Sequence, residues 1–76
     1  METDSETLDL RGLKCPLPAP LARRCLKRAK EGATVLVLAH DPMAAIDVPH
    51  MCRNEGFEVL EIQRQGDAAR MSLRKP

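Results

Sequence analysis

The chain has 76 residues, 43% of them hydrophobic, and a formal net charge of +1 at pH 7. This length supports one small domain with a modest core. The near-zero charge gives no overall field toward nucleic acid or membranes, and no apolar run approaches membrane-spanning length.

The first residues are acidic and polar, so we do not expect a secretory signal peptide. We expect residues 1–6 to form a frayed terminus of a single domain that covers residues 1–76. Leu8-Asp9-Leu10 alternates apolar and polar residues and predicts a short strand. A loop hinged at Gly12 should follow it.

From Pro18 to about Glu31 apolar residues recur at helical spacing, with basic residues on the other side. Gly32 suits the position just beyond the end of this helix. The apolar face comprises Leu21, Ala22, Cys25, Leu26 and Ala29.

Residues Ala33–Ala39 form a continuous apolar run rich in β-branched residues, which predicts a buried central strand. A second helix should follow, with Asp41 as its N-cap, Pro42 as its first residue and Gly56 at its end. Pro49 lies inside this span, so we expect a kink or a break there. Ile46, Met51 and Cys52 are the residues expected to face the core.

Phe57–Gln63 and Arg70–Arg74 read as two strands, and the Gly-Asp pair between them predicts a hairpin. The alternation slips between Val59 and Leu60, which indicates a bulge. The element order is therefore βαβαββ. A right-handed crossover should join the first two strands in parallel and place both helices on one face of a four-stranded mixed sheet. The expected fold class is an α/β (α+β) two-layer sandwich.

The stretch from Arg11 to Pro20, RGLKCPLPAP, carries the most chemical information. Cys15 precedes the first helix, whose free amides and partial positive charge favour a thiolate, and Arg11 and Lys14 lie nearby. Pro16 and Pro18 fix the backbone where the missing amide donors cost little. Pro20 leaves two alternatives open, because either the regular helix starts near Pro18 or its first turn is distorted.

The three cysteines are odd in number and far apart, which suggests neither a disulfide framework nor a zinc site. Cys25 and Cys52 are expected to pack as small apolar residues. His40 follows the second strand and reads as a surface histidine, although a contact with Cys15 is conceivable. No metal ligands are assigned, and a reducing, cytoplasmic compartment is expected.

Every charged residue from Arg11 to Lys30 is basic, although the whole chain is nearly neutral. Arg23 and Lys27 are four residues apart and could form a strip that docks an acidic partner, together with Arg11, Lys14 and Asp41. The alternative is an ordinary solvated helix face. For Asp41, capping the second helix is the preferred interpretation.

The chain resembles the TusA/SirA-like family of small sulfur-transfer proteins. The resemblance rests on the D-x-x-G-x-x-C-P-x-P pattern of Asp9, Gly12, Cys15, Pro16 and Pro18, and covers nearly the whole chain. It continues through Asp41-Pro42, Asp47-Val48-Pro49, Gly56 and Lys75. Pro20 is not part of the pattern.

The resemblance implies a βαβαββ two-layer fold, with Cys15 as the persulfide carrier and Asp9, Gly12, Pro16 and Pro18 as shaping residues. It also implies a cysteine desulfurase or rhodanese-like donor and an acceptor in tRNA thiolation, molybdenum cofactor maturation or sulfur oxidation. A carrier needs only an exposed, stabilised thiolate and a docking surface. No cofactor beyond the covalent persulfide is expected, and we favour a monomer that forms transient complexes.

Two other functions stay open. The basic segment could make the chain a nucleic-acid-binding or regulatory module, although the low net charge and the lack of stacking aromatic residues make direct binding of nucleic acid unexpected. A thiol redox sensor would need a resolving cysteine, and Cys52 is the candidate that folding could bring toward Cys15.

Overall fold

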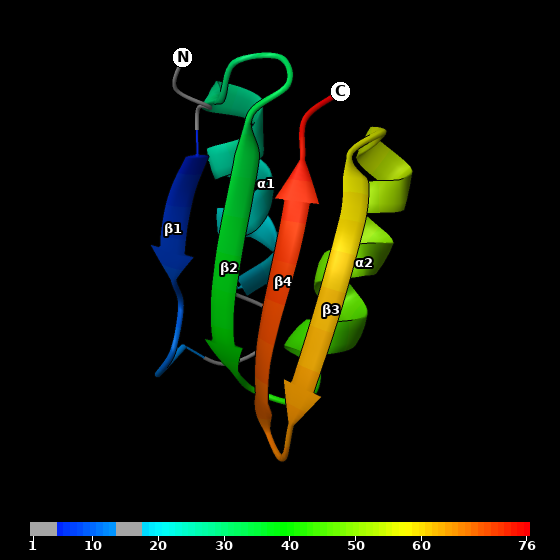
Figure 1. The fold of residues 1–76 in the computed structure, drawn as a ribbon. Coiled ribbons are helices and arrows are strands. Elements are labelled where there is room, and N and C mark those ends of the chain that lie inside the picture. The colour runs from blue at the N-terminus through cyan, green and yellow to red at the C-terminus, as the bar shows by residue number, and fades with distance from the viewer. Residues whose placement is uncertain (1–4, 14–17) are drawn as a thin grey trace.

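A computed structural model of the chain describes residues 5–13 and 18–76, and it contains one four-stranded sheet covered by two helices (Figure 1). The order βαβαββ and the two-layer architecture are as predicted. Both helices lie on the same face of the sheet, and the other face is open. The elements are β1 (Ser5–Asp9), α1 (Pro18–Arg28), β2 (Thr34–His40), α2 (Ala44–Glu55), β3 (Glu58–Gln65) and β4 (Ala68–Arg74).

The strands lie in the order β1-β2-β4-β3. β1 runs parallel to β2, and β4 is antiparallel to both β2 and β3. Because β1 and β2 are parallel and in register from Ser5↔Thr34 to Asp9↔Leu38, their carboxyl ends meet at one edge of the sheet, where α1 begins (Figure 1). The strand β1 starts at Ser5, so Ser5 and Glu6 are paired in the sheet rather than part of a frayed terminus.

β2 is central, as expected, but only one of its faces is buried. Val35, Val37 and Ala39 face the helices and are almost fully buried, whereas Leu36 and Leu38 on the open face are half-buried. Both helices lie on the same side of the sheet, so a continuous apolar strand does not imply burial on both faces here. The core between the layers also contains Ala22, Leu26, Val48, Cys52, Ala69, Met71 and Leu73.

α1 begins at Pro18, which resolves the question that Pro20 raised. Pro20 is the third residue of the helix, and the amides of the first three helical residues have no partner within a helix. The lost donor therefore costs no helical hydrogen bond. The helix ends at Arg28, earlier than expected. Gly32 instead lies in a turn closed by a hydrogen bond from the Ala33 amide to the Lys30 carbonyl, with a φ of 85°.

α2 starts at Ala44 rather than Pro42, and the predicted N-cap is not formed in the expected way. The Asp41 carboxylate accepts a hydrogen bond from the Met43 amide at 2.9 Å, and the Asp41 carbonyl accepts one from Ala44. Asp41 therefore shapes a turn that leads into the helix. Gly56 ends α2 in the left-handed conformation, with a φ of 84°, as predicted.

Of the kink or break predicted at Pro49, the break is wrong, because α2 continues through this residue to Glu55. Pro49 is buried, so its ring contributes to packing while its missing amide removes one hydrogen bond. Ile46 was expected in the core but is 55% exposed on the outer side of α2. Cys52 is fully buried and Met51 is half-buried, as the helical spacing indicated.

β3 and β4 form the predicted hairpin around Gly66-Asp67. Gly66, the first central residue of the turn, has a φ of 61°. Asp67, the second, has a negative φ, since only glycines among the described residues have a positive one. This is the pattern of a type II′ turn, which matches the twist of a hairpin. The register shift between Val59 and Glu61 confirms the predicted bulge, with Leu60 as the extra residue.

Candidate functional site at the β1–α1 edge

The predicted site residues Lys14, Cys15 and Pro16 lie outside the described residues. The chain is described on either side of them, up to Leu13 and again from Pro18. Leu13 packs against the core, and Pro18 is buried at the first position of α1. Both flanks are therefore fixed by packing at the edge where β1 and β2 end.

The loop after β1 is held by a tight turn. The Leu13 amide donates to the Leu10 carbonyl at 3.1 Å, and Gly12, at the third position of the turn, has a φ of 95°. A positive φ at this position defines a type II turn and favours glycine. Leu10 is 3% exposed, and its amide donates to the Leu38 carbonyl of β2 at 2.7 Å. The turn is thus anchored in both the core and the sheet.

Asp9 organises the start of this loop. Its carboxylate accepts hydrogen bonds from the Arg11 amide at 3.1 Å, from Arg11 Nε at 2.9 Å and from Arg11 Nη2 at 2.7 Å. These bonds to the Arg11 side chain and then to its amide lower the pKa of Asp9 to about 2. The same contact raises the pKa of Arg11. The Arg11 charge is therefore paired within the loop rather than free for a partner.

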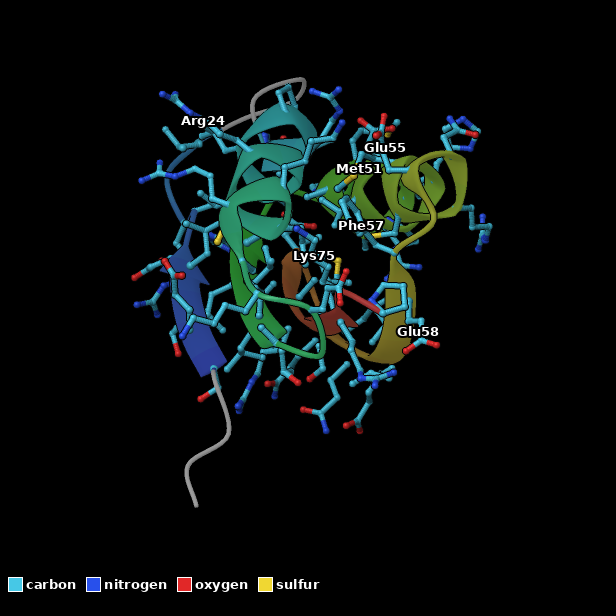
Figure 2. All side chains as sticks on the ribbon, turned by 90° about the horizontal axis from the view of Figure 1, so that it is seen from above. Arg24, Met51, Glu55, Phe57, Glu58 and Lys75 are labelled. Atoms are coloured by element: carbon cyan, nitrogen blue, oxygen red, sulfur yellow. The ribbon has the colours of Figure 1, made fainter. Side chains whose placement is uncertain are left out.

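Arg23 and Lys27 are brought together, but by a contact that the sequence pattern did not reveal. Arg23 Nε lies 3.0 Å from Glu55 Oε2, and Lys27 Nζ lies 3.3 Å from Glu55 Oε1. The bonds from Arg23 and then Lys27 lower the pKa of Glu55. Glu55 lies on the side of α2 that faces α1 (Figure 2). The strip predicted to dock a partner is thus partly neutralised as a tie between the two helices.

Lys75 has a structural role that the sequence analysis missed. Its ammonium Nζ donates to the carbonyls of Lys27 at 3.0 Å and Ala29 at 2.9 Å, at the carboxyl end of α1 (Figure 2). Its backbone also pairs with Gly32 and Ala33. A cation placed at unpaired carbonyls stabilises a helix terminus. In the sequence, only the match of Lys75 to the family pattern indicated that this residue has a role.

Burial raises the thiol pKa of both cysteines in the described part of the chain. Cys52 is fully buried, and desolvation raises its pKa to about 11. Cys25 is half-buried, and its pKa is raised first by desolvation and then by the nearby Glu6 carboxylate. Cys52 also lies eight residues into α2, about 12 Å from the edge where α2 begins. Both facts argue against Cys52 as the resolving thiol of a redox sensor.

Within residues 5–13 and 18–76, no group of three or more His, Cys, Asp or Glu side chains is arranged to hold a metal ion. His40 is exposed at the end of β2, at the same edge as the β1–α1 loop. No described helix is long and apolar enough to cross a membrane.

Comparison with known proteins agrees with the resemblance drawn from the sequence. Residues 6–75 match the family described as sulfurtransferase TusA. A protein of Buchnera aphidicola subsp. Baizongia pistaciae, described as sulfur carrier protein TusA, is 32% identical over 75 residues, which covers 99% of this chain and 95% of that protein. The crystal structure of a SirA-like protein from Desulfitobacterium hafniense shares the fold, with a TM-score of 0.77 and 21% identity over 91% of this chain and 95% of its own. The chain therefore belongs to the TusA family of sulfurtransferases.

Proposed function

We propose that this protein is a sulfur carrier and that Cys15 is the residue that holds the sulfur. Membership of the TusA family supports a role in sulfur transfer in general. The specific support for Cys15 is its place in the chain, between a turn locked by Asp9 and Gly12 and the first residue of α1. Cys52 and Cys25, with raised thiol pKa values, are poorer candidates.

The proposed loading step is a thiol–persulfide exchange. The Cys15 thiolate attacks the terminal sulfur of a donor persulfide, R–S–SH, and forms the new sulfur–sulfur bond of Cys15–S–SH. The sulfur–sulfur bond of the donor breaks, and the donor leaves as the thiolate R–S⁻. Unloading is the same exchange onto an acceptor, so no external oxidant or reductant is needed. No other cofactor is part of this proposal.

The donor in this proposal is a cysteine desulfurase or a rhodanese-like protein. The acceptor belongs to a route such as tRNA thiolation, molybdenum cofactor maturation or sulfur oxidation. A free thiol that cycles through a persulfide requires a reducing compartment, which is why we place the carrier in the cytoplasm, as a monomer with transient partners.

The test is loading by a cysteine desulfurase with cysteine as substrate, followed by intact-mass measurement. We expect a mass increase of one sulfur atom that disappears in Cys15→Ser and persists in the matched control Cys25→Ser. The proposal fails if wild type gains no sulfur, or if the adduct remains on Cys15→Ser.

A further inference from the structure

The outer edge of β1 is unpaired in the described part of the chain. β1 is the first strand of the sheet, and Ser5, Glu6, Thr7 and Asp9 are all exposed. The Leu10 amide donates to β2, and backbone groups alternate in direction along a strand. The amides and carbonyls of Ser5, Thr7 and Asp9 therefore point to the free edge, where a further strand could pair.

A groove of about 520 Å³ runs beside this edge, on the helix side of the sheet, between β1 and α1. It exists because α1 packs mainly on α2 and β2 and leaves the inner face of β1 uncovered. The apolar lining comes from Leu8 of β1 and Leu10 just after it, and from Leu21 of α1 and Ala29 just after that helix. A side chain of a strand added to β1 would enter this groove at every second position.

The charge of the groove selects one kind of strand. Arg24 and Arg28 line it from α1, and Figure 2 shows Arg24 projecting on the side of β1. Neither arginine has an ion-pair partner within the described ranges, in contrast to Arg23 on the other side of the helix. Only Glu6 opposes them in the lining, so the groove carries an excess of positive charge. Residues four apart on a helix rise by about 6 Å, close to the roughly 6.6 Å between alternate residues of a strand.

We propose that the β1 edge and the β1–α1 groove bind an extended segment of a partner protein, in which two acidic side chains at alternate positions, flanked by apolar ones, lie on the face toward the groove. The backbone of this segment pairs with Thr7, as in other cases of strand addition. Its apolar side chains contact Leu8 and Leu21, and its carboxylates pair with Arg24 and Arg28. That this partner is a sulfur donor or acceptor rests on the proposed function. Leu10 and Leu21 place one end of the groove at the edge of the sheet where β1 ends and α1 begins.

Binding is tested on the full chain, labelled with ¹⁵N, by titration with the synthetic peptide acetyl-Ser-Val-Thr-Glu-Thr-Glu-Thr-Val-Ser-amide. Its two valines and two glutamates share one face. We expect amide shifts at Ser5, Thr7 and Asp9, and about tenfold weaker binding in Arg24→Glu/Arg28→Glu. The matched control Arg70→Glu, on the open face of the sheet, should bind normally. A peptide with Lys in place of both Glu residues should bind at least about tenfold more weakly than the original.

The proposal is overturned if millimolar peptide shifts none of these three amides, or if shifts appear only on the open face around Leu36. Broadening of the β1 amides with protein concentration alone would show that a second copy occupies the edge, and would also overturn it. None of these readouts involves Cys15, so they are independent of whether the chain carries sulfur.

The link to sulfur transfer is tested with two further variants. Thr7→Pro removes an amide that points to the free edge, while Thr7→Val keeps the amide and serves as its control. If the segment belongs to the donor, Thr7→Pro and Arg24→Glu slow loading by the desulfurase about tenfold, whereas alkylation of Cys15 by iodoacetamide is unchanged. Unchanged loading with weakened peptide binding would exclude the donor as the partner. If even the wild type is not loaded, the proposed function is refuted. The peptide titration then still decides by itself whether the β1 edge binds an extended acidic segment.

Discussion

Removal of the Lys75 ammonium is expected to destabilise the domain measurably, because this group holds the carboxyl end of α1. In Lys75→Met, two hydrogen bonds from a charged donor to the Lys27 and Ala29 carbonyls are lost, one of them partly buried and one exposed. A sheltered bond of this kind contributes about 1.5–3 kcal/mol and an exposed one less. We therefore expect a loss of about 2 kcal/mol in the free energy of unfolding.

That loss is large for a chain of this size. Typical stabilities per residue give roughly 4–11 kcal/mol for 76 residues, and each kcal/mol shifts the melting temperature of such a domain by about 4–8 °C. Thermal unfolding followed by circular dichroism should show Tm lowered by about 8–16 °C in Lys75→Met. Lys75→Arg, which keeps the charge, should lose less than half of this.

The control is Arg70→Met, which removes an exposed cation from β4 and should change Tm by no more than about 2 °C. A Lys75→Met protein that melts within about 2 °C of wild type would refute the assignment of the Lys75 ammonium as the cap of α1. An equal loss in Lys75→Arg would show that ammonium geometry, rather than charge, carries the effect.

Three further predictions concern titration, ion pairing and thiol reactivity. The carboxyl of Asp9 should titrate near pH 2 by NMR, and its pKa should return toward 3.8 in Arg11→Ala. Because the pKa of Asp9 is lower in the folded state, the Asp9–Arg11 contact stabilises the fold above about pH 4, and this stabilisation is lost as the pH falls to about 2. The loss of stability between these pH values should therefore be smaller in Arg11→Ala. Glu55→Gln should lower the resistance to urea only slightly, since the paired side chains are partly exposed, and the difference should vanish in 1 M salt, at a Debye length of about 3 Å. A difference that persists there would contradict an ionic tie. In the native protein at pH 8, iodoacetamide should modify Cys25 faster than Cys52, and rapid labelling of Cys52 would contradict its burial.

Local patterns predicted most of the fold. Helical spacing correctly predicted that Ala22 and Leu26 of α1 are buried. Gly56 correctly predicted the end of α2, and Gly66 the hairpin turn. These signals are short-range, since they depend on backbone preferences and on residues a few positions apart. The bulge at Leu60 was visible for the same reason, as a slip in strand alternation.

The errors arose where distant residues decide the outcome. Pro49 reads locally as a helix breaker, yet α2 passes through it because the residue is buried against the rest of the fold. Ile46 looks like a core residue, but the helix presents Ala45, Val48 and Cys52 to the sheet instead. Tertiary packing overrides local conformational preference when burying apolar surface stabilises the fold by more than the unfavourable local conformation costs.

The sequence by itself determined the family, the order of the elements and Cys15 as the candidate carrier, because a motif and a periodicity are written in neighbouring residues. Only the tertiary structure decided which charges are free. Glu55 reaches α1 from α2, so Arg23 and Lys27 are paired, whereas Arg24 and Arg28 are left beside the open edge of β1. Charge pairing depends on distances of a few ångströms between side chains, and those distances exist only after the helices and strands have packed.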